Sequence, residues 1–212
     1  MDWKSWHDDY DNPGSALSRR LRVVQRHIRT ALDEAPPGPV RVVSACAGQG
    51  RDLLEVLVSH PRRAEVTARL VELDPRNVEF ARALAREHAL PDVDVREGDA
   101  ALSDNYAGLV PARIVLLCGV FGNISGEDIE RTVAASPQLC AQGGTVVWTR
   151  HREPPDLFPT ICGWFERVGY ERVSESDPDA GFGVGVHRLA APSQPLLPNQ
   201  RLFTFHGYRT LR

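Results

Sequence analysis

Hydrophobic and polar positions along the chain follow two different periods. Between residues 17 and 28, apolar side chains recur at every third or fourth position, which predicts an amphipathic helix beginning near Ser15. The proline- and glycine-rich stretch at residues 35–39 ends this helix. Short β-branched and apolar runs then alternate with helical stretches up to Gly169, which predicts a series of β–α units.

Five such units can be placed on the sequence. Their strands are expected at residues 40–45, 66–73, 93–97, 112–118 and 144–149. Helices are expected at residues 52–59, 75–89 and 155–168, and a further helix from Ser125. The run at residues 112–118 is apolar apart from Arg113, which is typical of a central parallel strand covered on both faces.

After Gly169 the alternation of strands and helices ends. Three extended stretches remain, at residues 170–174, 182–189 and 202–208. We expect at least two of them to form an antiparallel pair at one edge of the sheet, and the pattern leaves open which two. The fold class is therefore α/β: an open, mostly parallel, seven-stranded Rossmann-like sheet with helices on both faces and an antiparallel edge strand near the C-terminus.

The chain of 212 residues fits a single domain. We expect an N-terminal segment and helix at residues 1–38, a cofactor-binding core at residues 40–150, and a C-terminal part with antiparallel strands at residues 151–212. In such a sheet the ligand binds outside the carboxyl ends of the strands, here near the switch point between the first and fourth strands.

Composition and charge exclude several classes of function. The formal net charge is −3, so no basic surface points to a nucleic-acid partner. The polar, acidic start of the chain lacks the apolar core of a signal peptide, and no apolar run suggests a membrane partner. Four scattered cysteines without a Cys-x-x-Cys pair predict reduced thiols in a cytoplasmic protein. Because no two histidines have the spacing of metal ligands, no metal site is expected.

The most informative segment is VRVVSACAGQGRD at residues 40–52. A strand, a glycine-containing loop and a helix follow one another, which lets backbone N–H groups approach a ligand at the N-terminus of the helix. A dinucleotide-binding loop has a third glycine where this chain has Leu53, and Asp52 would repel a pyrophosphate. The loop therefore favours a cofactor without phosphate over the nicotinamide dinucleotide of an oxidoreductase.

Three further strand ends carry candidate ligand-binding residues. Glu72 ends the second strand, 22 residues after Gly50, where an acidic side chain can accept hydrogen bonds from both hydroxyls of a ribose. Asp99 follows the third strand directly after a glycine. The fourth strand ends in Gly-Val-Phe-Gly-Asn at residues 119–123.

With these strand ends in place, the sequence resembles the class I S-adenosylmethionine-dependent methyltransferases over about residues 40–150. The segments that carry the resemblance are VRVVSACAGQGRD, LVELDP, REGDA and LLCGVFGN. It implies that Glu72 binds the ribose of S-adenosylmethionine, that Asp99 contacts the adenine amino group, and that the backbone N–H of Ala100 contacts the adenine ring. The full set of cofactor-binding residues that it implies is Ser44, Ala45, Cys46, Gly48, Gly50, Glu72, Leu73, Asp99, Ala100, Cys118 and Val120.

The chain departs from the family at two positions of the first loop. Ser44 replaces an acidic residue, and Cys46 replaces the first glycine. A charge for the ammonium group of the cofactor could come instead from the N-terminal segment, for which the candidates are Asp8, Asp9 and Asp11. Arg51 and Asp52 either cap their helix or contact the amino-acid end of the cofactor.

The acceptor pocket is expected between the N-terminal segment and the ends of the fourth and fifth strands. Phe121 and Asn123 are candidate substrate-binding residues, although Phe121 could lie in the core and Asn123 could serve a turn. His151 is a candidate for both substrate binding and general-base catalysis, and its alternative is a solvated loop histidine. His7 and Tyr10 are further catalytic candidates, on an aromatic segment that forms either a lid or a surface arm.

The expected function is methyl transfer from S-adenosylmethionine to a small-molecule methyl acceptor. A small molecule is favoured because no inserted domain and no basic face are visible in the sequence. The alternative is a non-catalytic module that binds S-adenosylmethionine. The sequence leaves open whether the protein is a monomer or a homodimer.

Overall fold

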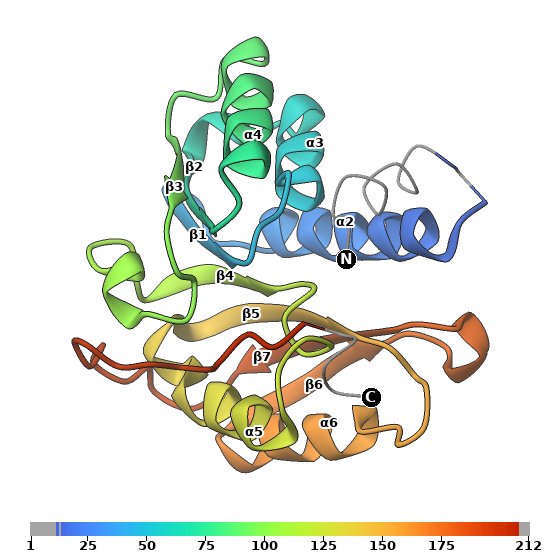
Figure 1. Ribbon diagram of the computed structural model, residues 1–212. Coiled ribbons are helices and arrows are strands. Elements are labelled where there is room, and N and C mark those ends of the chain that lie inside the picture. The colour runs from blue at the N-terminus through green and yellow to red at the C-terminus, as the bar shows by residue number, and fades with distance from the viewer. Residues whose placement is uncertain (1–11, 13, 208–212) are drawn as a thin grey trace.

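A seven-stranded sheet forms the centre of the computed structural model, which describes residue 12 and residues 14–207 (Figure 1). The strands run in the order β3-β2-β1-β4-β5-β7-β6. Their bounds are β1 (Val40–Ala45), β2 (Val66–Glu72), β3 (Val93–Glu97), β4 (Ala112–Leu117), β5 (Cys140–Arg150), β6 (Tyr170–Glu175) and β7 (Gly183–Leu189). The first five strands are parallel, and β7 is antiparallel to both of its neighbours.

Helices cover both faces of this sheet (Figure 1). They are α2 (Ala16–Asp33), α3 (Arg51–Ser59), α4 (Pro75–Glu87), α5 (Gly126–Ala135) and α6 (Phe158–Arg167). Helices α2, α3 and α4 lie on one face, and α5 and α6 lie on the other. Single 3₁₀ turns occur at Arg63–Glu65, Ser103–Tyr106, Ser136–Gln138 and Pro178–Ala180.

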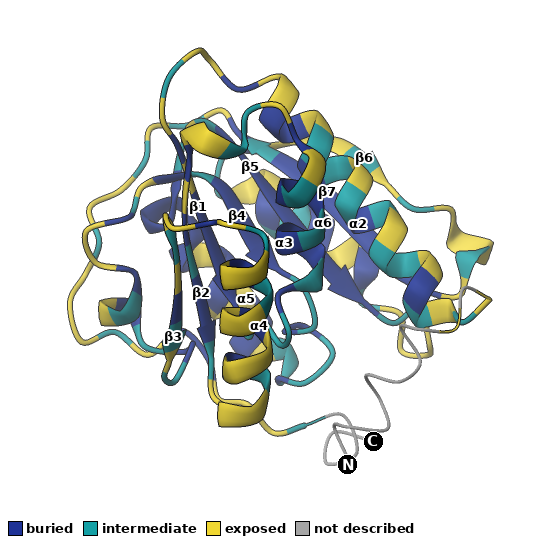
Figure 2. Ribbon diagram, turned by 90° about the horizontal axis from the view of Figure 1, so that it is seen from above, coloured by how far each residue is buried: buried dark blue, intermediate teal, exposed yellow. Residues whose placement is uncertain are grey.

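The sheet separates two hydrophobic cores. Because side chains alternate along a strand, Val42 packs under α2 and α3, whereas the next residue, Val43, packs in the core on the side of α5 and α6. Figure 2 shows buried strands at the centre and exposed positions along the outer faces of the helices. This arrangement explains why the central strands carry apolar side chains on both faces.

The fold class expected from the sequence is confirmed, including the antiparallel pair near the C-terminus. That pair is β6 and β7, with β7 inserted between β5 and the edge strand β6. Strand β5 begins at Cys140, four residues before the expected start, and α6 begins at Phe158 rather than at residue 155. No helix among the described residues is long and apolar enough to span a membrane.

The third extended stretch, expected at residues 202–208, does not join the sheet within the part of the chain that the structure describes. Arg201, directly before this stretch, forms an isolated bridge with Leu102. We call residues 197–207 the C-terminal strap. Its backbone N–H groups bind loops and α5 instead of a strand: Leu202 donates to the Ala101 carbonyl at 2.8 Å and Thr204 to the Asp128 carboxylate at 2.9 Å.

Candidate cofactor and active site

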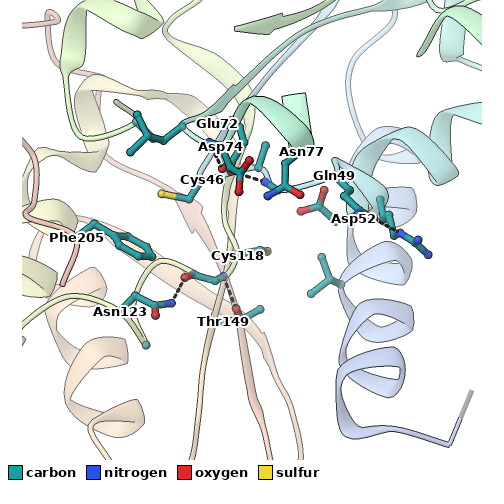
Figure 3. A pocket seen from close by; sticks show the side chains of 18 of the residues that line it. Cys46, Gln49, Asp52, Glu72, Asp74, Asn77, Cys118, Asn123, Thr149 and Phe205 are labelled. Atoms are coloured by element: carbon teal, nitrogen blue, oxygen red, sulfur yellow. Dashed lines mark hydrogen bonds between the residues drawn. The ribbon is translucent and has the colours of Figure 1, made fainter. Parts of the chain in front are cut away.

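A cavity of about 820 Å³ opens at the carboxyl ends of the parallel strands. Ligand pockets for small molecules typically have volumes of about 300–1,000 Å³. Its walls come from the segments that follow β1, β2, β3, β4 and β5, from α2, and from the C-terminal strap (Figure 3). The cavity lies where β1 and β4 are neighbours and the strand order reverses, which is the site expected from the sheet topology.

The structure brings together most of the residues singled out in the sequence. Those that line the cavity are Cys46, Gly48, Glu72, Leu73, Asp99, Ala100, Cys118, Asn123 and His151. Others lie nearby but do not line it, namely Ser44, Ala45, Gly50, Val120 and Phe121. Ser44 and Ala45 are buried within β1, and Val120 is buried beneath the loop after β4. His7 and Tyr10, with Asp8, Asp9 and Asp11, lie outside the described residues.

The first loop turns as a glycine loop does, although it begins with a cysteine. Cys46 has a φ of +52°, in the left-handed region that favours glycine, and Gly48 and Gly50 have φ values of +56° and +69°. Gly50 directly precedes α3, and a Cβ there would lie 2.7 Å from Leu70 Cδ2. The replacement of a glycine by Cys46 therefore leaves the path of the loop intact.

Glu72 is held in place by the loop it faces. Its Oε2 accepts a hydrogen bond from the Gly48 N–H at 2.8 Å, and its Oε1 accepts one from the Asp74 N–H at 2.9 Å. Each carboxylate oxygen keeps a second lone pair for a ligand in the cavity. A fixed carboxylate with two accepting oxygens fits the two hydroxyls of a ribose.

Asp99 lies at the end of the neighbouring strand and is fixed in a similar way. Its Oδ1 accepts a hydrogen bond from the Ala101 N–H at 2.9 Å, and its Oδ2 lies 3.0 Å from an Nη atom of Arg201 in the C-terminal strap. The Gly98 N–H donates to the Glu72 carbonyl at 2.9 Å, which ties the two strand ends together. The two carboxylates thus lie side by side along one edge of the cavity.

Asp52 occupies the opposite side of the cavity from Phe205, next to Gln49 (Figure 3). Its side chain is buried, and burial raises its pKa to about 6 despite the hydrogen bond that it accepts from the Leu53 N–H. Arg20 of α2 lines the same cavity. Asp52 thus bonds a backbone N–H in the first turn of α3 and also lines the cavity, as Arg51 does, and contact of either residue with a cofactor stays a prediction.

The loop after β4 presents an unsatisfied polar atom. The Gly119 N–H donates to Thr149 Oγ1 at 2.9 Å, and Asn123 Nδ2 donates to the Gly119 carbonyl at 2.7 Å (Figure 3). Asn123 Oδ1 is buried and accepts no hydrogen bond within the described part of the chain. Because an unsatisfied buried acceptor costs about 1–3 kcal/mol, a ligand that donates a hydrogen bond fits this wall of the cavity.

His151 follows β5 and lines the cavity near Gly122, whose Cβ position lies 3.7 Å from the imidazole. The expectation for Phe121 needs correction, because its ring lies in the core and not in the cavity. It packs with its centroid 5.7 Å from that of Trp148 and 6.3 Å from that of Phe165. Phe121 follows β4 by four residues, and its ring belongs to the core on the side of α5 and α6.

Several lining residues were not singled out as ligand contacts in the sequence. They include Arg20, Asn77, Thr149, Phe203 and Phe205. The signal for Thr149 was its place at the end of the fifth strand. The signal for Phe203 and Phe205 was their alternation with polar residues, which instead predicted a strand. The two cavity cysteines, Cys46 and Cys118, are kept as neutral thiols because burial raises the pKa of each.

Comparison with known proteins gives a consistent picture. Residues 16–159 match the model of a family described as putative methyltransferase. No curated protein matches the chain. The match covers α2, the first loop, Glu72, Asp99, Asn123 and His151, but it ends before the C-terminal strap begins.

Solved structures with a similar fold include several methyltransferases. An O-methyltransferase family protein from Burkholderia thailandensis is 18% identical, covers 90% of this chain and 61% of its own length, and has a TM-score of 0.67. The CurJ carbon methyltransferase is 14% identical, covers 81% of this chain and 54% of its own, with a TM-score of 0.63. A TehB-like SAM-dependent methyltransferase from Corynebacterium glutamicum is 19% identical and has a TM-score of 0.57. The match covers 76% of this chain and 86% of that protein.

The chain therefore spans less than two thirds of the length of the first two of these proteins. At these identities the likeness shows a shared fold. The family match, at residues 16–159, covers more than half of the chain. On that match, the chain belongs to the family of putative methyltransferases.

Proposed function

We propose that the protein transfers a methyl group from S-adenosylmethionine to a small-molecule acceptor. The observation that carries the proposal is the Glu72 carboxylate, which the Gly48 and Asp74 N–H groups hold at the cavity. A carboxylate at the end of β2 together with a glycine loop at the end of β1 is the arrangement that binds a ribose at this edge of a sheet. Leu53 in place of a third glycine, and Asp52 beside it, favour a nucleoside without a phosphate.

The residues of the cavity fit the parts of this cofactor. Glu72 would bind the ribose hydroxyls, and Asp99 with the Ala100 N–H would bind the adenine. Asp52 would bind the ammonium group, in place of the acid that Ser44 replaces. A cationic ammonium beside Asp52 would favour the charged carboxylate, which otherwise lacks solvent.

When bound, S-adenosylmethionine supplies a methyl group on a sulfonium, and the attacking acceptor atom releases S-adenosylhomocysteine as it gains the methyl. The protein's part is to align the acceptor with that methyl group and to exclude water. Such alignment contributes about 7–11 kcal/mol to lowering a barrier in favourable cases. The fixed loops after β1 and β4 suit this task, because hydrogen bonds hold both.

Asn123 and His151 are the groups that we assign to the acceptor. Asn123 Oδ1 would accept a hydrogen bond from a hydroxyl or amine of the acceptor. The His151 imidazole would accept the proton that such a group loses, a contribution of about 10²–10⁴-fold in rate. A small molecule is supported by the cavity of about 820 Å³ and the acidic net charge. An O-methyltransferase family 2 protein from Planctomyces limnophilus of similar fold was solved in complex with apigenin.

A transfer assay tests this proposal. The protein is incubated with S-adenosylmethionine and a panel of phenols, alcohols, amines and carboxylic acids, and mass spectrometry detects methylated acceptors and S-adenosylhomocysteine. We expect transfer to at least one acceptor, and we expect the His151→Asn variant to lower kcat about 10²-fold or more. The matched control is His88→Asn, at the distant C-terminal end of α4.

Cofactor binding without transfer to any acceptor would support the alternative, a non-catalytic module that binds S-adenosylmethionine. Absence of binding would rule out both functions. Equal loss of rate in the His151→Asn and His88→Asn variants would remove His151 from the catalytic role.

A further inference from the structure

The C-terminal strap crosses the cavity from the end of β3 to the loop after β4. Near its middle, Arg201 forms an ion pair with Asp99, in which Nη1 and Oδ2 are 3.0 Å apart. At its end, the His206 N–H donates to the Asn123 carbonyl at 2.9 Å. The strap lies outside residues 16–159, so the family match says nothing about its role.

Two aromatic residues of the strap line the cavity but differ in burial. Phe203 is 1% exposed and belongs to the core on the side of α5 and α6, whereas Phe205 is 42% exposed. Figure 3 shows the Phe205 ring facing the space between Asn123 and Cys46. Leu73, directly after β2, lines the same cavity and is 68% exposed. Two large apolar side chains at the cavity are therefore partly exposed.

The positions of the polar groups decide which part of a nucleoside would reach these side chains. Glu72 lies between Asp52 on one side of the cavity and Phe205 on the other (Figure 3). With a ribose at Glu72 and a charged amino-acid group at Asp52, the remaining part of the ligand points toward Phe205 and Asp99. That part is the purine, which is planar and largely apolar on its faces.

We propose that Phe205 forms an adenine-binding wall of the cavity, with Leu73 as the apolar side chain on the other side of the ring. This inference rests on the proposed function, because it takes the ligand to be S-adenosylmethionine. The ion pair between Arg201 and Asp99 anchors the strap beside the adenine. The strap and the end of β3, about 100 residues apart in the sequence, would thus bind the adenine together.

The test measures dissociation constants of S-adenosylhomocysteine and of adenosine by calorimetry. We expect the Phe205→Ala variant to bind both ligands at least about tenfold more weakly, because stacking of an aromatic ring on a base is lost. The Phe205→Trp variant should bind within about threefold of the wild type. Leu197→Ala is the matched control, since Leu197 is a 54% exposed strap residue that does not line the cavity.

The outcomes separate this inference from the proposed function. If the wild type binds neither ligand, the proposed function fails. If the wild type binds both and Phe205→Ala binds them equally well, the adenine wall is wrong, and an altered acceptor KM in that variant would assign Phe205 to the acceptor. If Phe205→Ala melts at a lower temperature than the wild type, the Phe205→Trp variant decides the question. Binding by folded Phe205→Trp within about threefold of the wild type supports stacking on the adenine, and binding tenfold weaker overturns the adenine wall.

Discussion

Individual residues set the shape and the charge of the site. Cys46 and Gly50 both adopt left-handed backbone conformations in the loop after β1, yet only one of them is a glycine. Cys46 occupies a conformation that costs an ordinary residue roughly 1–2 kcal/mol, so the surrounding contacts must hold it. One such contact is the Ala47 N–H, which donates to the Val71 carbonyl at 3.0 Å.

Gly50 combines this backbone conformation with a lack of space. We expect Gly50→Ala to lower the free energy of unfolding by about 2–4 kcal/mol, because the new Cβ meets Leu70 and Leu54 and φ is positive. Gly38→Ala is the control, since Gly38 also has a positive φ but open space around it, and should cost about 1 kcal/mol. Urea denaturation measures both. Equal losses would show that Gly50 is not closely packed.

Asp52 links the charge of the site to pH. Its pKa of about 6 in the folded protein lies above its ordinary 3.8, so its protonated form stabilises the fold fully below pH 4. That stability is lost as pH rises through 6, by about 3 kcal/mol in total. We expect Asp52→Asn to be more stable than the wild type at pH 8 and of similar stability at pH 4, measured by urea denaturation.

The same substitution should weaken cofactor binding, because the asparagine cannot pair with an ammonium group. S-adenosylhomocysteine should bind Asp52→Asn roughly tenfold more weakly at pH 8. Glu55→Gln, one turn further along α3, is the control for a change of charge. Unchanged affinity of Asp52→Asn for S-adenosylhomocysteine would show that another part of the chain binds the ammonium group.

At the scale of elements, the sequence predicted most of the fold because strands and helices have distinct periods. The strand predicted at residues 112–118 and the helix end predicted before residues 35–39 depend only on local patterns. The strand β4 and the end of α2 lie where expected. The positions of Phe121 and of the stretch at residues 202–208 were harder to predict from the sequence. An apolar residue at a strand end can face the core or a cavity, and an alternating stretch can pair with a strand or with loops, so tertiary contacts decide both.

The strap offers a comparison of two phenylalanines two residues apart. We expect Phe203→Ala to lower the free energy of unfolding by about 3–5 kcal/mol, because its ring is fully buried. Phe205→Ala should cost about 1 kcal/mol or less, since its ring is partly exposed at the cavity. Chemical denaturation distinguishes them. A larger loss in Phe205→Ala would mean that this ring is a structural residue.

At the scale of the whole molecule, the sheet separates two cores, and residues that pack against both line the cavity at the carboxyl ends of the strands. The core on the side of α5 and α6 contains a buried polar pair, in which Trp148 Nε1 donates to His187 Nδ1 at 3.1 Å. Burial lowers the pKa of His187 to about 4, so the imidazole is neutral in the folded protein. The pair connects β5 with β7, and thereby the end of the parallel sheet with its antiparallel edge.

His187 makes stability depend on pH in the sense opposite to Asp52. The unfolded chain binds a proton near pH 6.5 and the folded protein only near pH 4, so stability falls by about 3 kcal/mol as pH drops between these values. We expect His187→Gln to remove this acid-induced loss while lowering stability at pH 8. Melting temperatures at pH 4.5 and pH 8 measure it. A wild-type-like pH profile in His187→Gln would contradict the assignment.

The central claim is that the cavity holds S-adenosylmethionine through Glu72. Calorimetric titration with S-adenosylhomocysteine tests it most directly, with Glu72→Ala and the exposed Glu87→Ala compared side by side with the wild type. We expect saturable one-to-one binding by the wild type and Glu87→Ala, and binding at least about tenfold weaker by folded Glu72→Ala. No binding by the wild type at millimolar ligand, or equal binding by Glu72→Ala, would contradict it.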